Sequence, residues 1–99
     1  MKLHILHAAE EEFLEAIEYY EDITPGLGLR LKEEVRRTLR WIKANPEMPR
    51  ERSPRHRRVN CTTFPYYIAY HIRAGEIFVV AIAHAKRRPG YWARRLKER

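Results

Sequence analysis

Residues 66–84 read YYIAYHIRAGEIFVVAIAH, and this stretch decides the fold. Two runs rich in β-branched and aromatic residues, 66–73 and 76–84, flank Ala74-Gly75, a dipeptide that suits a two-residue hairpin loop. We therefore expect two antiparallel strands with Arg73 opposite Glu76. Simple alternation then places the following side chains under the rest of the protein: Tyr66, Ile68, Tyr70, Ile72, Ile77, Val79, Ala81 and Ala83. The other face carries Tyr67, His71, Arg73, Phe78, Val80, Ile82 and His84.

The residues before this hairpin predict two further strands and two helices. Residues 2–7 are short and apolar, and residues 58–63 precede the hairpin as a third strand of a meander. From Ala9 to Tyr20, apolar residues recur at helical spacing. Six glutamates fill the opposite face of this first helix: Glu10, Glu11, Glu12, Glu15, Glu18 and Glu21.

A second helix is expected between two proline-containing signals. Thr24-Pro25 predicts its start, with Thr24 as the N-cap, and Asn45-Pro46 predicts its end. The chain is thus expected to form one α+β domain over residues 1–99. Its order is an N-terminal strand, a helical hairpin and a three-stranded antiparallel meander, in one sheet packed under the two helices. A short helix is also expected over 91–99.

The charge is divided unevenly along the chain, which has a net charge of +7. Up to Pro49 there are seven Lys and Arg residues and ten acidic residues, which gives a net charge of −3. From Arg50 onward there are thirteen Lys and Arg residues and three acidic residues, which gives a net charge of +10. Such a field attracts nucleic acid or an acidic protein. Candidate nucleic-acid contacts lie in the proline-rich loop over 46–57, in the hairpin and after the last strand: Arg50, Arg52, Arg55, Arg57, Arg73 and Lys86.

Several side chains of the second half suit phosphodiester chemistry, which needs cations on the phosphate and groups that move protons. The candidate phosphate-binding cations are Arg58, Arg73, Arg87 and Arg88. His84 and His71 titrate near neutrality, and Tyr91 could transfer a proton if nearby arginines lowered its pKa. Each has a structural alternative: the histidines bind backbone, and Tyr91 and Trp92 pin the C-terminal segment to the sheet edge.

Other classes of protein are disfavoured. The longest apolar run, residues 77–83, is too short to span a membrane, and the start of the chain lacks a secretory signal. The lone Cys61 forms no internal disulfide, so we expect a cytoplasmic protein. No zinc-ligand set, phosphate-binding glycine loop or nucleophile elbow is present, and we expect neither a metal nor a cofactor.

The element order and three local stretches resemble the RelE/ParE superfamily of bacterial toxins over nearly the whole chain. These stretches are Arg58 leading into a strand, residues 66–70 (YYIAY), and the closing run over 84–92 (HAKRRPGYW). The resemblance implies a toxin of a type II toxin–antitoxin pair, also called a plasmid-stabilisation protein. It also implies a cognate antitoxin, whose amphipathic, acidic segment would cover the helical hairpin or the basic sheet face.

Two mechanisms divide this superfamily. RelE-like members cut messenger RNA on the ribosome, and the resemblance places His84, Tyr91, Arg58, Arg87 and Arg88 in the matching catalytic neighbourhood. ParE-like members inhibit DNA gyrase and need no nuclease residues. Because His84 and Tyr91 offer proton-transfer groups beside arginines, we favour RNA cleavage narrowly over gyrase inhibition. A non-catalytic basic binding module, or a degenerate toxin, is the alternative of another class. The catalytic interpretation requires these cations to gather on one accessible surface beside the last strand.

Overall fold

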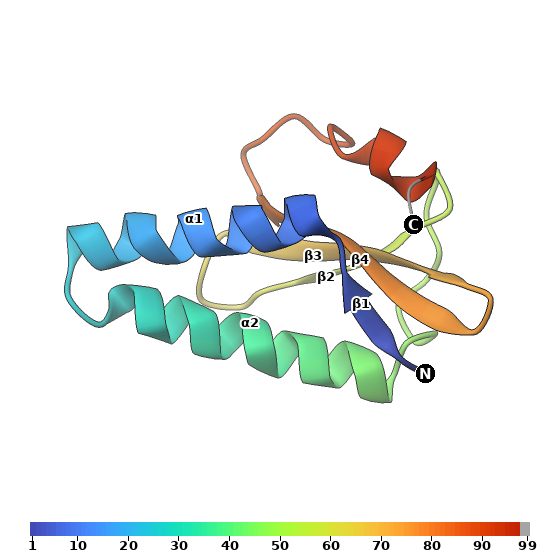
Figure 1. The fold of residues 1–99 in the computed structure, drawn as a ribbon, viewed down its shortest axis with the longest axis horizontal. Helices are drawn as coiled ribbons and strands as arrows, with labels where there is room; N and C mark the ends of the chain where they lie inside the picture. The colour runs from blue at the N-terminus through green and yellow to red at the C-terminus, as the bar shows by residue number, and fades with distance from the viewer. Residues whose placement is uncertain (98–99) are drawn as a thin grey trace.

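The computed structural model of the chain describes residues 1–97 and has the predicted order of elements (Figure 1). In sequence they are β1 (Leu3–Ile5), α1 (His7–Ile23), α2 (Leu27–Ala44), β2 (Arg57–Asn60), β3 (Tyr66–Arg73), β4 (Glu76–His84) and the short 3-10 helix η1 (Ala93–Lys97). The α+β prediction is confirmed. The predicted C-terminal helix begins at Ala93 and not at Tyr91 and is a 3-10 helix, and the last two residues of its predicted range lie outside the described residues. Among the described residues, no helix has both the length and the hydropathy needed to cross a membrane.

The four strands form one mixed sheet in the order β1-β4-β3-β2. The meander of β2, β3 and β4 is antiparallel, as expected. The strand β1 pairs with the free edge of β4 and runs parallel to it, with Leu3 beside Ile77 and Ile5 beside Val79. One further bond, from the Leu6 N–H to the Val79 carbonyl over 3.0 Å, extends this pairing to the start of α1. The first helix therefore leaves the sheet halfway along β4.

A β-bulge in β4 changes the predicted faces of the sheet. Arg73 lies opposite Glu76 as expected, but Ala69 pairs with Ala81 while Tyr70 pairs with Val79. Val80 is therefore an extra residue, and an extra residue reverses the alternation beyond it. Ala81 and Ala83 consequently lie on the face away from the helices, with Tyr67 and Trp92, and Ile82 packs in the helix-side core. The predicted faces of these three residues and of His84 are wrong for this reason.

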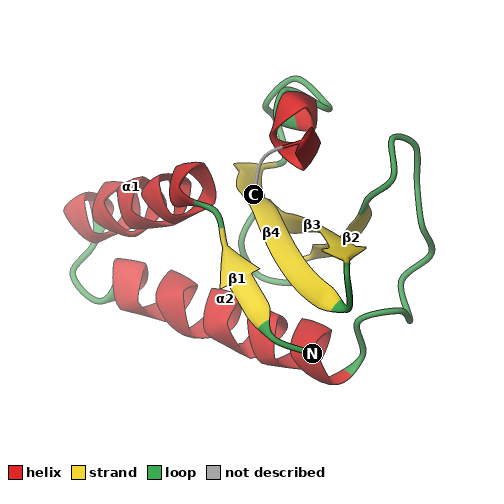
Figure 2. Cartoon of the chain, turned by 45° about the vertical axis from the view of Figure 1, so that its right-hand side comes forward, coloured by secondary structure: helices red, strands yellow, loops and turns green. Residues whose placement is uncertain are grey.

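The two helices cover one face of the sheet, and the C-terminal segment covers part of the other (Figure 2). Buried residues of the helix-side core are Ala9, Ala16, Leu31, Val35, Ile42, Phe64, Ile68, Tyr70, Ile77, Val79 and Ile82. The helices approach closely at Gly28, where a Cβ would lie 2.4 Å from the Ile17 carbonyl oxygen. The second core contains Leu6, Tyr67, Ala69, Val80, Ala81, Ala83 and Trp92.

The connection between the helices differs from the prediction. Thr24 ends α1, with its N–H bonded to the Tyr20 carbonyl, and α2 begins only at Leu27. The Glu21 carboxylate takes over the predicted capping role by accepting hydrogen bonds from the N–H groups of Gly26 at 2.8 Å and Gly28 at 3.0 Å. Gly26 has φ of +91°, a backbone conformation that favours glycine.

The predicted strand over 58–63 ends early because a buried carboxylate binds the residues that follow it. Glu34 of α2 accepts hydrogen bonds from the Thr62 hydroxyl at 2.7 Å and from the N–H groups of Thr62, Thr63 and Phe64. Burial alone would raise the pKa of Glu34, but these hydrogen bonds outweigh it and the pKa is lowered. The turn between β2 and β3 is thus fixed to α2 by one ionised side chain.

Candidate functional site

Four of the five predicted catalytic residues fall into two groups that line different depressions, and Arg88 lines neither of these. His84, Arg87 and Tyr91 line a cavity against α1, whereas Arg58 lines a groove on the other side of the C-terminal segment. No described residue lines both. The bulge in β4 accounts for this separation, because it turns His84 toward the helix side, where its ring meets Tyr66. The expected single basic surface beside the last strand is therefore not formed by these five residues.

The cavity against α1 is lined by His84, whose tautomer is fixed by a backbone hydrogen bond. It has a volume of about 140 Å³ and lies between α1 and the end of β4. Nδ1 of His84 accepts a hydrogen bond from the Lys86 N–H over 3.0 Å, so Nε2 carries the proton of the neutral ring. The ring meets Tyr66 edge to face at 5.1 Å between centroids. His84 thus makes the backbone contact that was its structural alternative.

Tyr91 is bound to an acidic residue of α1. Its hydroxyl donates a hydrogen bond to Oε2 of Glu12 over 2.6 Å, while the Arg87 guanidinium stacks on its ring at 3.9 Å. Burial, followed by the hydrogen bond and charge of Glu12, raises the pKa of Tyr91, and the opposing effect of Arg87 and Arg95 is smaller. Arg87 and Arg95 do act to lower this pKa, but the net shift is upward, so the condition under which Tyr91 was expected to transfer a proton is not met. A tyrosine whose pKa is raised stays protonated at neutral pH.

Glu12 itself is a residue that the sequence analysis misplaced. It was expected on the exposed face of α1, but its carboxylate is largely buried and binds three groups. Besides Tyr91, Oε1 accepts the Ile82 N–H at 3.1 Å, and Oε2 accepts from Arg95 at 3.0 Å. Arg95 also donates to the Val80 carbonyl at 3.0 Å. Glu12 and Arg95 thus provide hydrogen-bond partners for the Ile82 N–H and the Val80 carbonyl, which lie on the edge of β4 beyond the point where β1 ends.

The groove on the other side contains Arg58 in a fixed orientation. Its guanidinium lies 3.8 Å above the ring of Tyr67 and donates to Oδ1 of Asn60 at 3.1 Å. Its buried Nε has no hydrogen-bond partner within the described chain. Arg50 and Arg52 line the same groove, as does His56, which the sequence analysis did not single out. Nothing in the local sequence distinguishes His56 from its neighbours in an arginine-rich loop.

Trp92 forms the floor of this region. Only 2% of the residue is exposed, its Nε1 donates to the Tyr67 hydroxyl over 2.8 Å, and its indole contacts the His56 ring edge to face at 4.6 Å. His56 is buried, and its Nδ1 binds the Pro54 carbonyl at 2.8 Å. Trp92 therefore pins the C-terminal segment to the sheet, which was its structural alternative, and covers the small residues Ala69, Ala81 and Ala83.

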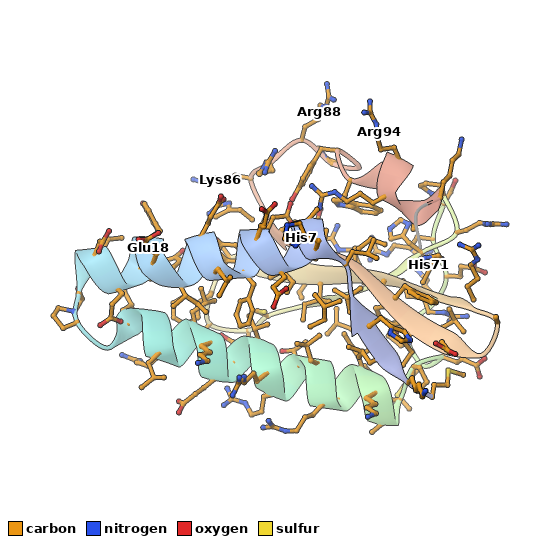
Figure 3. All side chains as sticks on the ribbon, in the orientation of Figure 1. His7, Glu18, His71, Lys86, Arg88 and Arg94 are labelled. Carbon is orange, nitrogen blue, oxygen red and sulfur yellow. The ribbon has the colours of Figure 1, made fainter. Side chains whose placement is uncertain are left out.

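The remaining predicted contacts are dispersed. Arg57 holds the preceding loop by donating to the carbonyls of Glu47 at 3.1 Å and Pro49 at 2.6 Å. Lys86 and Arg88 point away from the protein after β4 (Figure 3). Arg55 and Arg73 are exposed at other points of the surface.

Two further titratable groups are unsuited to surface chemistry. His71 is buried, and burial, followed by Arg73 and Arg55, lowers its pKa. It therefore stays neutral, contrary to the expectation that it titrates near neutrality. Burial and the charge of Glu34 raise the pKa of the Cys61 thiol to about 11, so that this cysteine is a poor nucleophile.

Comparison with known protein families identifies the family to which the chain belongs. A family profile described as "ParE toxin of type II toxin-antitoxin system, parDE" matches residues 3–89. The chain belongs to this ParE toxin family. None of the curated proteins compared with the sequence matches it. Among solved structures, a chain of the "Chromosomal ParDE TA system from P. aeruginosa" is similar in fold, with a TM-score of 0.77 at 17% sequence identity. The match covers 87% of this chain and 97% of that one.

This ParE toxin is accordingly the toxic member of a type II pair, and its partner is a cognate antitoxin. The resemblance recognised in residues 66–70 and 84–92 is confirmed at the level of the family.

Proposed function

We propose that this ParE toxin stops growth by inhibiting DNA gyrase, and that it does not cleave messenger RNA. One observation carries the proposal: the Tyr91 hydroxyl donates a hydrogen bond to Glu12 and is thereby held within the protein. A general base for RNA cleavage must accept the proton of a 2′-hydroxyl within hydrogen-bond reach. A protonated tyrosine with a raised pKa is poorly suited to that role.

The relation between His84 and Arg58 further supports this proposal. Cleavage requires a proton-transfer group and a cation on the same phosphate, within a few ångströms of each other. His84 lines the α1 cavity with Arg87, whose guanidinium is stacked on Tyr91, while Arg58 lines the opposite groove. The predicted catalytic set therefore does not converge on one substrate atom. Inhibition by binding places no such demand on the arrangement of these side chains.

The covered sheet face is a third support. RNA that bound on the face of β3 and β4 away from the helices would meet the C-terminal segment. Trp92 fills that face over Ala69, Ala81 and Ala83 and is held by the Tyr67 hydroxyl. RNA would have to displace a buried tryptophan to reach the sheet, and loss of the packing of such a side chain costs about 3–5 kcal/mol.

Induction of the toxin without its antitoxin tests the proposal in cells. We expect incorporation of labelled thymidine to fall before that of labelled methionine, because gyrase inhibition stops replication first. Co-expression of the antitoxin is the control and should restore both. Methionine incorporation that falls first would overturn the proposal. Normal growth after induction of the folded chain would favour the degenerate toxin or the non-catalytic module.

A second candidate, RNA cleavage, is favoured by one specific feature. The groove of Arg50, Arg52 and Arg58 contains His56, and Arg58 has a buried Nε without a partner in the described chain. Cleavage from this groove would depend on His56 and not on His84 or Tyr91. A His56→Gln variant that is folded but no longer stops translation would support this candidate.

A further inference from the structure

The outer face of α2 concentrates positive charge that the sequence analysis did not single out, because the first half of the chain is acidic overall. Six cations lie along this helix: Arg30, Lys32, Arg36, Arg37, Arg40 and Lys43. Of its two acids, Glu34 is buried and bound to the β2–β3 turn, so that only Glu33 is exposed among the cations. We call Arg30, Arg36, Arg37 and Arg40 the α2 arginine face.

The charges of the α2 arginine face are not neutralised by ion pairs within residues 1–97. The three pairs in that part of the chain are His4 with Glu76, His7 with Glu11, and Arg95 with Glu12. All four arginines are exposed. Glu33 and Arg37 line two adjoining shallow depressions, one with Arg30 and the other with Arg36 and Arg40, so the face is continuous.

The chemistry of this face suits a phosphate backbone better than a protein. Protein interfaces also use arginine, but they combine it with buried apolar or aromatic anchors. Of the large apolar side chains exposed in residues 1–97, only Leu29 and Trp41 belong to α2, near its two ends. Binding to phosphates requires cations alone, and guanidinium groups match phosphate oxygens with paired hydrogen bonds. Arg36 and Arg40 are separated by about 6 Å along the helix axis, since each residue rises 1.5 Å.

We propose that the α2 arginine face binds the sugar-phosphate backbone of duplex DNA. The choice of DNA rests on the proposed function, because gyrase acts on DNA and a toxin bound to gyrase lies close to it. The contacts are independent of base sequence, as backbone contacts are. In this arrangement the cavity and the groove beside the C-terminal segment remain free, because they are lined by residues outside α2.

Binding of the full chain, freed from its antitoxin, to a 30-base-pair DNA duplex of random sequence tests this proposal over a series of salt concentrations. The test variant is Arg36→Gln/Arg37→Gln/Arg40→Gln, which removes three charges and keeps residues compatible with a helix. The matched control, Lys2→Gln/Arg94→Gln/Lys97→Gln, removes three exposed charges elsewhere. Circular dichroism establishes whether each variant is folded. If the triple variant is unfolded, the single variants Arg36→Gln and Arg40→Gln are tested in its place.

We expect the wild type and the control to bind DNA with a steep dependence on salt. The test variant should bind about 100-fold more weakly at 0.1 M salt and show a log–log salt slope smaller by about 2.7, since each phosphate contact contributes about 0.9. Equal binding by the test variant and the wild type would overturn the proposal. So would tighter binding of polyglutamate than of DNA by the wild type, which would identify an acidic protein as the partner. If DNA binds as expected but gyrase is not inhibited, the proposed function is wrong, whereas the assignment of the α2 arginine face to DNA binding is retained.

Discussion

The hydroxyl of Tyr91 donates a 2.6 Å hydrogen bond to the carboxylate of Glu12, joining the C-terminal segment to the first helix. The same carboxylate oxygen accepts from Arg95, and its partner oxygen binds the Ile82 N–H at the edge of β4. One largely buried acid therefore connects three parts of the chain that are far apart in sequence. This bond gives Tyr91 a structural role, and in the proposed function the residue has no catalytic one.

Replacing both predicted proton-transfer residues tests this assignment. We expect the His84→Ala/Tyr91→Phe variant to stop growth as the wild type does, because neither side chain contacts a substrate in the proposed mechanism. The measurement is colony formation after induction, with the amount of folded protein determined in parallel. Loss of growth arrest in a variant present at the wild-type level would show that one of the two residues is catalytic.

Trp92 is expected to contribute strongly to stability. The Trp92→Ala variant should lose about 3–5 kcal/mol in the free energy of unfolding, because it empties the core between the sheet and the C-terminal segment. Urea denaturation measures this change. The control is Leu14→Ala on the exposed side of α1, for which we expect a change within about 0.5 kcal/mol. Similar stability of the two variants would mean that the C-terminal segment does not hold the sheet.

Gly28 is expected to be intolerant of even a methyl group. In Gly28→Ala the new Cβ would lie 2.4 Å from the Ile17 carbonyl oxygen, so that the two helices must separate. Overpacking of this kind costs about 1–3 kcal/mol, although alanine favours a helix more than glycine does. Thermal unfolding compares this variant with Leu29→Ala at the next, exposed position. A more stable Gly28→Ala protein would contradict the close approach of α1 and α2.

Stability should depend on acid pH through Glu34. Its pKa is lowered in the folded protein, so its contribution is complete above the unfolded pKa of about 4.3 and is lost as the pH falls through the folded value. We expect Glu34→Gln to be less stable than the wild type by about 2 kcal/mol near neutral pH. The difference should shrink below pH 4.3 as the wild-type carboxylate is protonated.

Urea denaturation from pH 7 to pH 3 measures this dependence. The control is Glu33→Gln, whose side chain is exposed on the same turn of α2 and lacks these hydrogen bonds. A difference between wild type and Glu34→Gln that stays constant over this range would show that the carboxylate of Glu34 does not bind the β2–β3 turn as an ion.

The order of the elements could be predicted because it depends on local pattern. The apolar spacing from Ala9 to Tyr20 and the Ala74-Gly75 turn specify a helix and a hairpin with little help from the rest of the chain. The bulge at Val80 could not be predicted, because Val79, Val80 and Ala81 are all apolar and fit either face. Since the faces beyond Val80 depend on that residue, the predicted position of His84 was wrong.

The site was harder to predict because identical residue types have different roles in it. Glu12 is one of six glutamates in the first helix, and only the position of β4 and the C-terminal segment makes it a buried acceptor. The arginines of α2 were hidden by the acids of α1 in the same half of the sequence. Charge averaged along a chain does not show which helix carries it.

The most direct measurement is the supercoiling of relaxed plasmid by purified DNA gyrase in the presence of the full chain freed from its antitoxin. We expect supercoiling to be inhibited by the wild type and by His84→Ala/Tyr91→Phe alike, and to be restored when the antitoxin is added. Unchanged supercoiling by gyrase, together with cleavage of messenger RNA on ribosomes by the same preparation, would contradict the proposed function.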